Sequence, residues 1–232
     1  GVALLPVTLR NVEPNVSVKG LSPQGKVSDL KPGSDAEIIA WFRKVQRYDE
    51  SQIERGEAKR DGVVSLPKVL ADGSNKHHVE SRALSLLAGL NGVKTLDLPK
   101  PVGNDPRPFE VVGIPLSPGF HVVEIASQRL GNSLLHEEYG DARTMYVRSS
   151  ALVTNLGVHF KLGRENAVAF VTTLDKGQPV AGAAVQVSDC TGKALAKGST
   201  DAKGLVELKG LSPQAPYCDG RTQAGSTDGE YE

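Results

Sequence analysis

The fold class is decided by residues 167–187, which read AVAFVTTLDKGQPVAGAAVQV. An apolar run at 167–174 gives way to four polar or glycine residues at 175–178, and a second run follows at 180–187, where Val185 and Val187 share a face. Short runs rich in β-branched residues and separated by turn residues are typical of antiparallel strands. This stretch therefore predicts a strand, a turn and a second strand.

The same pattern extends to both sides of this stretch. Strands are predicted at 145–153, 158–162, 194–196 and 205–208, with a further turn at 201–204. Strands divided by turns every 8 to 12 residues or so indicate an antiparallel sandwich. Residues 212–232 are polar and lack a strong strand pattern, although a seven-stranded sandwich needs another strand. We therefore expect the C-terminal module to be truncated.

The N-terminal region predicts a second β module. Residues 2–9 and 16–20 alternate as two short strands, and 21–33 has the Ser, Pro, Gly and Lys content of a loop. The β pattern returns at 94–98, 109–116 and 120–126. Ser117, Pro118 and Gly119 join the last two runs, and suit either a hairpin or a tight strand-to-strand corner.

One helix interrupts the strands. Ser34 and Glu37 form a capping box, in which each side chain can bond to a backbone N–H near the start of a helix. Apolar residues follow at helical spacing, with basic and polar residues on the other face. The spacing predicts a helix at about 35–48 whose apolar stripe is a packing face; the stripe consists of Ile38, Trp41, Phe42 and Val45.

The region between this helix and the next strands is less regular. Residues 50–61 are highly charged, 63–70 suit a strand, 72–75 suit a turn, and 79–90 suit either a helix or a strand pair. We therefore predict a mainly β chain of two antiparallel, fibronectin- or Ig-like β-sandwich domains. The first is expected at 1–128 with a helical insertion near 34–92, and a linker at 129–144 precedes the second at 145–232.

Composition excludes several kinds of partner. The chain of 232 residues carries 27 basic and 27 acidic residues, and this balance gives no electrostatic reason to bind nucleic acid. No apolar run reaches the length of about 18 residues that a membrane span needs, so we expect no direct membrane insertion. Because Gly1 stands where an initiator Met is expected, we expect the start of the gene product to be missing.

Few residues suggest catalysis or metal binding. His78 and Glu80 would share a face of a strand and could hold a metal, but no third ligand lies nearby, so the sequence 77–80 is read as an exposed loop. His136 lacks the second His of an HExxH site, and His159 is expected to be a packed or surface histidine. We predict no catalytic, metal or cofactor-binding residue, and no enzyme.

The two cysteines, Cys190 and Cys218, are not in a CxxC pair, so zinc or thioredoxin-like chemistry is not predicted. Both lie in the C-terminal region and can form one disulfide in an oxidising compartment. Two unpaired thiols remain the alternative.

Several long sequence segments resemble those of one known family. Residues 146–161 read YVRSSALVTNLGVHFK, residues 169–175 read AFVTTLD, and residues 178–183 read QPVAGA. Together with 109–116 and 119–124, these phrases resemble the macroglobulin-like domains of bacterial alpha-2-macroglobulins. The likeness covers roughly 109–208 well and 1–48 more loosely.

The resemblance implies a role for the parent protein. Members of the family are large periplasmic protease inhibitors: a protease cuts a bait region, the molecule rearranges, and a thioester in a CxEQ-type motif captures the protease. The resemblance thus implies framework domains of a host-defence inhibitor, with neighbouring domains and target proteases as partners, and a location in the periplasm with a lipoprotein anchor. No CxEQ motif follows Cys190 or Cys218, so the covalent trap lies elsewhere. Ig-like modules of a surface adhesin or carbohydrate-binding protein are the alternative.

Overall fold

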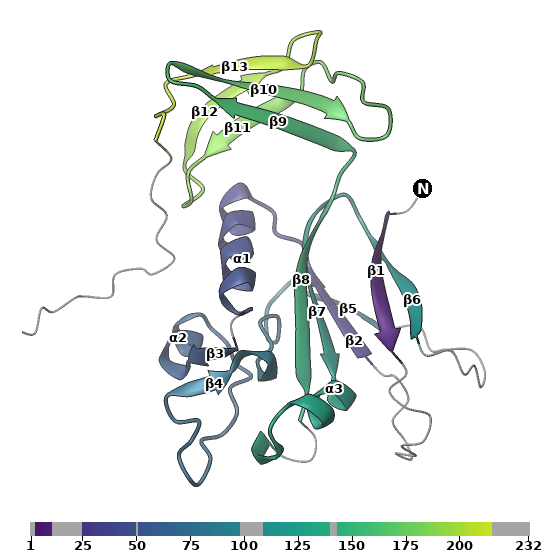
Figure 1. The fold of residues 1–232 in the computed structure, drawn as a ribbon, viewed down its shortest axis with the longest axis vertical. Coiled ribbons are helices and arrows are strands. Elements are labelled where there is room, and N and C mark those ends of the chain that lie inside the picture. Colours follow the sequence, from purple (N-terminus) through teal and green to yellow (C-terminus); the bar gives the residue numbers. More distant parts are fainter. Residues whose placement is uncertain (1–2, 11–24, 50, 98–108, 140–142, 215–232) are drawn as a thin grey trace, which may run out of the picture. The chain divides into compact units, whose positions relative to one another are not determined.

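The computed structural model describes residues 3–10, 25–49, 51–97, 109–139 and 143–214, and Figure 1 shows its strands and helices. The chain is mainly β, and every strand pair among the described residues is antiparallel, which confirms the predicted fold class. The chain divides into two compact units. Unit 1 comprises Gly1–Ser34 and Lys44–Thr154, and unit 2 comprises Asp35–Arg43 and Asn155–Glu232.

Unit 1 is built on a four-stranded sheet (Figure 1). Its strands are β5 (Lys94–Asp97), β2 (Gly25–Leu30), β7 (Gly119–Ser127) and β8 (Met145–Val153), in that order. Because β2 and β7 lie inside the sheet, both edges of each are hydrogen-bonded.

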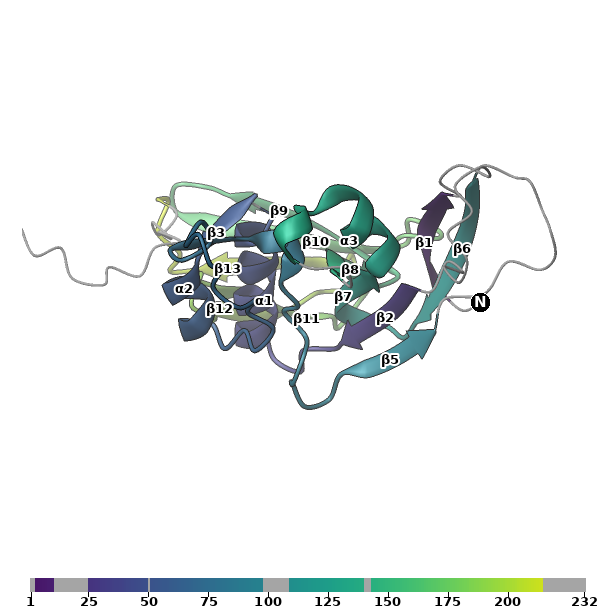
Figure 2. The same ribbon diagram turned by 90° about the horizontal axis from the view of Figure 1, so that it is seen from below.

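A two-stranded ribbon packs on one face of this sheet. It consists of β1 (Ala3–Arg10) and β6 (Phe109–Leu116), which pair along their whole length and are seen from below in Figure 2. Ile114 and Leu116 of the ribbon form a buried core with Val27 and Val123 of the sheet. Since β6 pairs with β1 while β7 pairs with β2 and β8, the connection at 117–118 is a strand-to-strand corner rather than a hairpin.

The predicted helical insertion contains a single long helix. Helix α1 spans Asp35–Arg47, as predicted, and is followed by β3 (Gln52–Glu54), α2 (Arg55–Arg60), β4 (His78–Glu80) and the short 3-10 helix η1 (Ser81–Ala83). The apolar stripe of α1 is narrower than predicted: Ile38, Trp41 and Val45 are half-buried, whereas Phe42 is 55% exposed. Among the described residues, no helix is long and apolar enough to cross a bilayer.

Two local predictions, for residues 25–30 and 63–70, are wrong. Residues 25–30 form β2 rather than a loop, because pairing with β5 and β7 outweighs their polar composition. Residues 63–70 form no strand because side chains bond their backbone groups instead: Arg55 donates to the carbonyl of Pro67, and Asn75 donates to Lys68 and accepts from the Leu70 N–H. The turn at 72–75 and strand β5 are confirmed, and the strand predicted at 16–20 lies outside the described residues.

The predicted linker at 129–144 is also structured where it is described. It contains most of α3 (Gln128–Leu134), which starts where the Ser127 hydroxyl accepts the Leu130 N–H, and the 3-10 helix η2 (Glu137–Tyr139). The next strand, β8, was expected to open the second module, but it pairs with β7 in unit 1. The nine paired positions of β7 and β8 explain this difference. The limits of the two domains stay predictions.

Unit 2 contains the strands predicted from the C-terminal third. One sheet has the order β13 (Leu205–Lys209), β10 (Asn166–Thr173), β9 (Leu156–Leu162), and the other pairs β11 (Ala184–Ser188) with β12 (Ala194–Ser199). Ala167, Ala169, Val206 and Leu208 form the buried core between them. The turn predicted at 201–204 ends in Gly204, where φ is +75° and an added Cβ would lie 2.6 Å from the Val171 carbonyl oxygen.

The ribbon-to-sheet core should contribute strongly to the stability of unit 1. Ile114 is only 4% exposed, so we expect Ile114→Ala to lower the free energy of unfolding by about 2–5 kcal/mol, because it removes buried methyl groups and leaves a cavity. Urea denaturation followed by circular dichroism measures this change.

Leu152→Ala is the matched control, because Leu152 on β8 is 67% exposed and should cost less than about 0.5 kcal/mol. Equal losses in the two variants would contradict the packing of the ribbon on the sheet.

Candidate functional site

Two opposite charges lie side by side on β7 and β8 of the unit 1 sheet. Glu124 of β7 and Arg148 of β8 are direct partners in the strand register. Side chains alternate along a strand, and Val123 points to the core under the ribbon, so Glu124 and Arg148 point to the other face. Their side chains are 3% and 5% exposed. Charged groups this deeply buried require polar partners.

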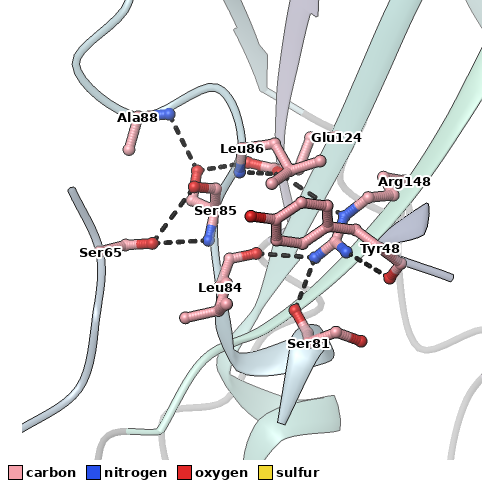
Figure 3. A network of polar contacts seen from close by, with 9 residues as sticks. All are labelled: Tyr48, Ser65, Ser81, Leu84, Ser85, Leu86, Ala88, Glu124 and Arg148. Carbon is pink, nitrogen blue, oxygen red and sulfur yellow. Dashed lines mark hydrogen bonds and ion pairs between the residues drawn. The ribbon is translucent and has the colours of Figure 1, made fainter. Parts of the chain in front are cut away.

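Arg148 obtains its partners from three backbone carbonyls of the insertion (Figure 3). Its guanidinium donates to the carbonyl oxygen of Tyr48 at 2.9 Å, of Ser81 at 2.9 Å and of Leu84 at 2.7 Å. Its Nε lies 3.9 Å from Glu124 Oε2, which is an ion-pair distance but too long for a hydrogen bond. Burial lowers the pKa of Arg148 and the charge of Glu124 opposes this, so the guanidinium stays protonated.

Glu124 accepts hydrogen bonds from the same insertion. The Ser85 hydroxyl donates to Oε1, and the Leu86 N–H donates to Oε2 at 2.7 Å. The Ser85 hydroxyl in turn accepts the Ala88 N–H at 3.0 Å, and the Ser85 N–H donates to the Ser65 hydroxyl at 2.7 Å. Figure 3 shows these bonds as one continuous network.

This network holds an irregular chain segment to a sheet. Residues 84–88 make no regular backbone ladder, and in their place Glu124 accepts the Leu86 N–H while Arg148 donates to the Leu84 carbonyl. Although a serine beside a carboxylate can suggest a nucleophile and its base, Ser85 is 4% exposed and has a partner on each side of its hydroxyl. The arrangement therefore suits structural anchoring.

A second polar cluster lies where α1 ends. The Tyr48 hydroxyl donates to Asp61 Oδ2 at 2.9 Å, Arg47 pairs with the same carboxylate, and Arg47 Nε lies 2.9 Å from Glu57 Oε1. Lys44 donates to the Asp61 carbonyl oxygen at 2.8 Å, and burial lowers the pKa of this amine. Burial, together with the bond to Asp61, raises the pKa of Tyr48 well above its usual range.

A buried histidine lies on the ribbon side of the sheet. His121, 2% exposed, places Nδ1 at 2.8 Å from Asp29 Oδ1 and Nε2 at 2.8 Å from the Ser117 carbonyl oxygen. A carbonyl oxygen can only accept, so the Nε2–H of His121 donates to Ser117, and Nδ1 is hydrogen-bonded to the carboxyl group of Asp29. The pair thereby ties β2 to the corner between β6 and β7.

The residues weighed from sequence do not come together. His78 is exposed on β4, and Glu80 pairs with Arg82 at 2.8 Å. His136 is exposed, and the His159 ring stacks on Phe170 at 6.3 Å between centroids. Across the part of the chain that the structure describes, no three His, Cys, Asp or Glu residues gather as metal ligands would.

The predicted disulfide stays a prediction. Cys190 is half-buried in the turn between β11 and β12, which is shaped by Asp189 Oδ1 accepting the N–H groups of Thr191 and Lys193. Cys218 lies outside the described residues.

Sequence reasoning missed both buried polar pairs, Glu124 with Arg148 and His121 with Asp29. The signal was present in the run at 120–126, FHVVEIA, where a histidine and a glutamate interrupt an otherwise apolar strand. A charge inside such a run implies a buried partner. The sequence does not say that the partners would be Asp29, 92 positions away, and Arg148 on the next strand.

Comparison with known protein families supplies the assignment. Residues 153–226 match the family model described as the bacterial alpha-2-macroglobulin MG3 domain. This part of the chain is similar to a domain of the bacterial alpha-2-macroglobulins. The resemblance predicted from the sequence is thus confirmed, and the matched residues include all five strands of unit 2, which we call the macroglobulin-like module.

Two solved structures of a bacterial alpha-2-macroglobulin also show similarity to this chain. A crystal structure of native alpha-2-macroglobulin from Escherichia coli spanning domains NIE-MG1 has 16% identity and a TM-score of 0.43, covering 90% of this chain and 79% of that one. A second, spanning MG0-NIE-MG1, has 15% identity and a TM-score of 0.40; this chain covers 52% of it. Because both TM-scores are low, the assignment relies on the match of 153–226. A comparison with curated proteins finds no match.

Loss of Arg148 should destabilise unit 1 strongly. Arg148→Ala removes the ion-pair partner of the buried Glu124 and the guanidinium that donates to three carbonyls, so we expect a loss of about 3–5 kcal/mol in the free energy of unfolding. Urea denaturation measures it. Arg82→Ala removes an exposed pair and should cost less than about 1 kcal/mol. A small loss for Arg148→Ala would refute the anchoring role.

Stability should also depend on Tyr48 at high pH. Because the folded-state pKa of Tyr48 is raised, its contribution is fully present below the unfolded value of about 10 and is lost as pH rises above it. The wild-type chain should therefore lose more stability than Tyr48→Phe between about pH 8.5 and 11. Urea midpoints at both pH values test this, and parallel losses in the two proteins would contradict it.

Proposed function

We propose that this chain supplies framework domains of a bacterial broad-spectrum protease-trapping inhibitor. The observation that carries the proposal is the match of residues 153–226 to the bacterial alpha-2-macroglobulin MG3 domain. A framework role fits the chemistry of the described residues, because the buried side chains of Glu124, Arg148 and His121 form hydrogen bonds to other segments of the same chain. In this proposal the chain is not an enzyme.

The covalent step of such an inhibitor would come from another part of the full-length protein. Cys190 is followed by Thr191, Gly192 and Lys193, and Cys218 by Asp219, Gly220 and Arg221. Neither sequence supplies the Cys and Gln of a CxEQ-type thioester. The chain would therefore hold the shape of the inhibitor while a thioester elsewhere captures the protease.

The partners and location follow from this role. The chain would contact neighbouring domains of its parent polypeptide, and would meet target proteases only through the full-length protein. It would act outside the cytoplasm, in the periplasm, anchored through an N-terminal lipoprotein segment. A bridge between Cys190 and Cys218 would be compatible with that compartment.

Protease trapping can be tested with two proteins. The full product of the natural gene and a chain of residues 1–232 are each incubated with several unrelated endopeptidases. We expect the full product to form protease adducts that survive denaturing electrophoresis and to reduce cleavage of a large protein substrate. The chain of residues 1–232 should do neither, because it lacks the thioester motif.

Two results would contradict the proposal. One is a full-length product that leaves every protease active and forms no adduct. The other is an adduct formed by residues 1–232 alone, which would place the reactive group inside this chain.

A further inference from the structure

The turn at Asn91 and Gly92 combines an amide side chain with a following residue that has no side chain. Both residues are exposed, and the φ angle of Gly92 is +78°. A Cβ added to Gly92 would meet nothing within 4 Å, so the space around its backbone is open. Asn91 is also the only asparagine of the chain that a glycine follows. A single ring closure would therefore join the amide carbon of Asn91 to an unobstructed backbone nitrogen.

No hydrogen bond holds this turn in the part of the chain that the structure describes. The Asn91 side chain has no partner there, and the Gly92 N–H donates to no carbonyl. The turn precedes β5, whose first paired residue is Lys94. Segments without hydrogen bonds open at little cost in free energy, so Asn91 and Gly92 can change conformation while the rest of unit 1 stays folded.

The other described asparagines are held in place. Asn75 is 4% exposed and is bonded at both ends of its amide, and Asn155 is bonded at both ends to Asp175. Asn166 lies in β10 and donates to a carboxylate on β13, and Asn132 lies in α3. Each of these four is followed by a residue that carries a side chain. The turn before β5 is therefore chemically distinct.

We propose that Asn91 is a site of spontaneous modification at which the side-chain amide is lost. The Gly92 nitrogen forms a bond to Cγ of Asn91, the bond from Cγ to the amide nitrogen breaks, and that nitrogen leaves as ammonia with the proton of the Gly92 N–H. Water, the only co-reactant, then opens the resulting five-membered cyclic imide at either of its two carbonyls. The products are aspartate and isoaspartate, and no atom is oxidised or reduced.

Two features of the turn favour this reaction. A side chain at position 92 would crowd the attacking nitrogen, and glycine removes that obstacle. The amide nitrogen attacks once its proton is removed, and among the described residues no carbonyl binds the Gly92 N–H. Asparagine is also one of the residues that heat damages most readily in proteins. The inference concerns this turn alone and is independent of the proposed function.

The modification would alter a segment that is fixed at both ends. On one side, residues 84–88 are held to the sheet by Glu124 and Arg148, and on the other, Lys94 pairs with Asp29. Both products add a negative charge to a chain whose formal net charge is +0, and isoaspartate also inserts an extra carbon into the main chain. We therefore expect amide hydrogen exchange at the start of β5 to be faster in the isoaspartyl form.

Peptide mapping by mass spectrometry tests the proposal on the unsubstituted chain of residues 1–232. The folded protein is incubated in warm buffer at neutral and at mildly alkaline pH, and the conversion of each asparagine to an acid is followed with time. We expect Asn91 to be converted at least about tenfold faster than Asn155 or Asn166, whose conversion requires local opening. The rate at Asn91 should rise with pH, and both aspartate and isoaspartate should appear there.

Two variants separate ring closure from simple exposure. Asn91→Gln keeps an exposed amide but would need a larger ring, so loss of ammonia at this position should fall at least about tenfold. Gly92→Ala keeps Asn91 and adds a methyl group beside the attacking nitrogen, and should also slow the reaction. Hydroxylamine, which cleaves cyclic imides, should cut the unsubstituted chain between residues 91 and 92 and leave Asn91→Gln intact.

The other outcomes overturn the proposal. Equal rates at Asn91 and Asn155 would mean that the turn confers no reactivity. Conversion of Asn91 to aspartate alone, or at an unchanged rate in Gly92→Ala, would mean that water attacks the amide directly. No conversion of Asn91 in the folded chain, while a urea-denatured sample is converted, would mean that the fold protects the turn. Unchanged exchange in β5 after conversion would contradict the expected effect on that strand.

Discussion

The structure of unit 1 depends on one buried ion pair between its two longest sheet strands, Glu124 on β7 and Arg148 on β8. Each charge is costly to bury, and each recovers that cost through hydrogen bonds to backbone groups of residues 48–88. An insertion with little regular structure is thereby fixed on a regular sheet. Its conformation is determined by the sheet below it rather than by its own helical or strand propensities.

The two faces of this sheet are stabilised by different interactions. The ribbon face packs Val27, Val123, Ile114 and Leu116 into a conventional apolar core, whose stability comes from area removed from water. The opposite face, where Val122 is also buried, adds directional hydrogen bonds, which specify a geometry more narrowly than packing does. In the macroglobulin-like module the buried core combines Ala167 and Ala169 of β10 with the larger Val206 and Leu208 of β13, and the apolar side chains of β9 are not part of it.

How far the sequence could predict this structure differs from element to element. Helix α1 and the strands of unit 2 carry strong local patterns, and the structure confirms them at their predicted places. Strand β2 was missed because KVSDL has no strand pattern, and only pairing on both of its edges makes it one. The anchor was missed for a related reason: hydrogen bonds between Arg148 and residues 48, 81 and 84 span 64 to 100 positions, and no local spacing encodes them.

The chain of hydrogen bonds from Asp29 through His121 to the Ser117 carbonyl has a consequence for how this protein can evolve. The side chain at position 121 must form hydrogen bonds in two opposite directions while almost fully buried, and an imidazole ring has a nitrogen on each side for this purpose. Replacing either partner alone strands a polar group in an apolar core. Positions 29 and 121 are therefore expected to change together or not at all, and related sequences that lack one should lack both.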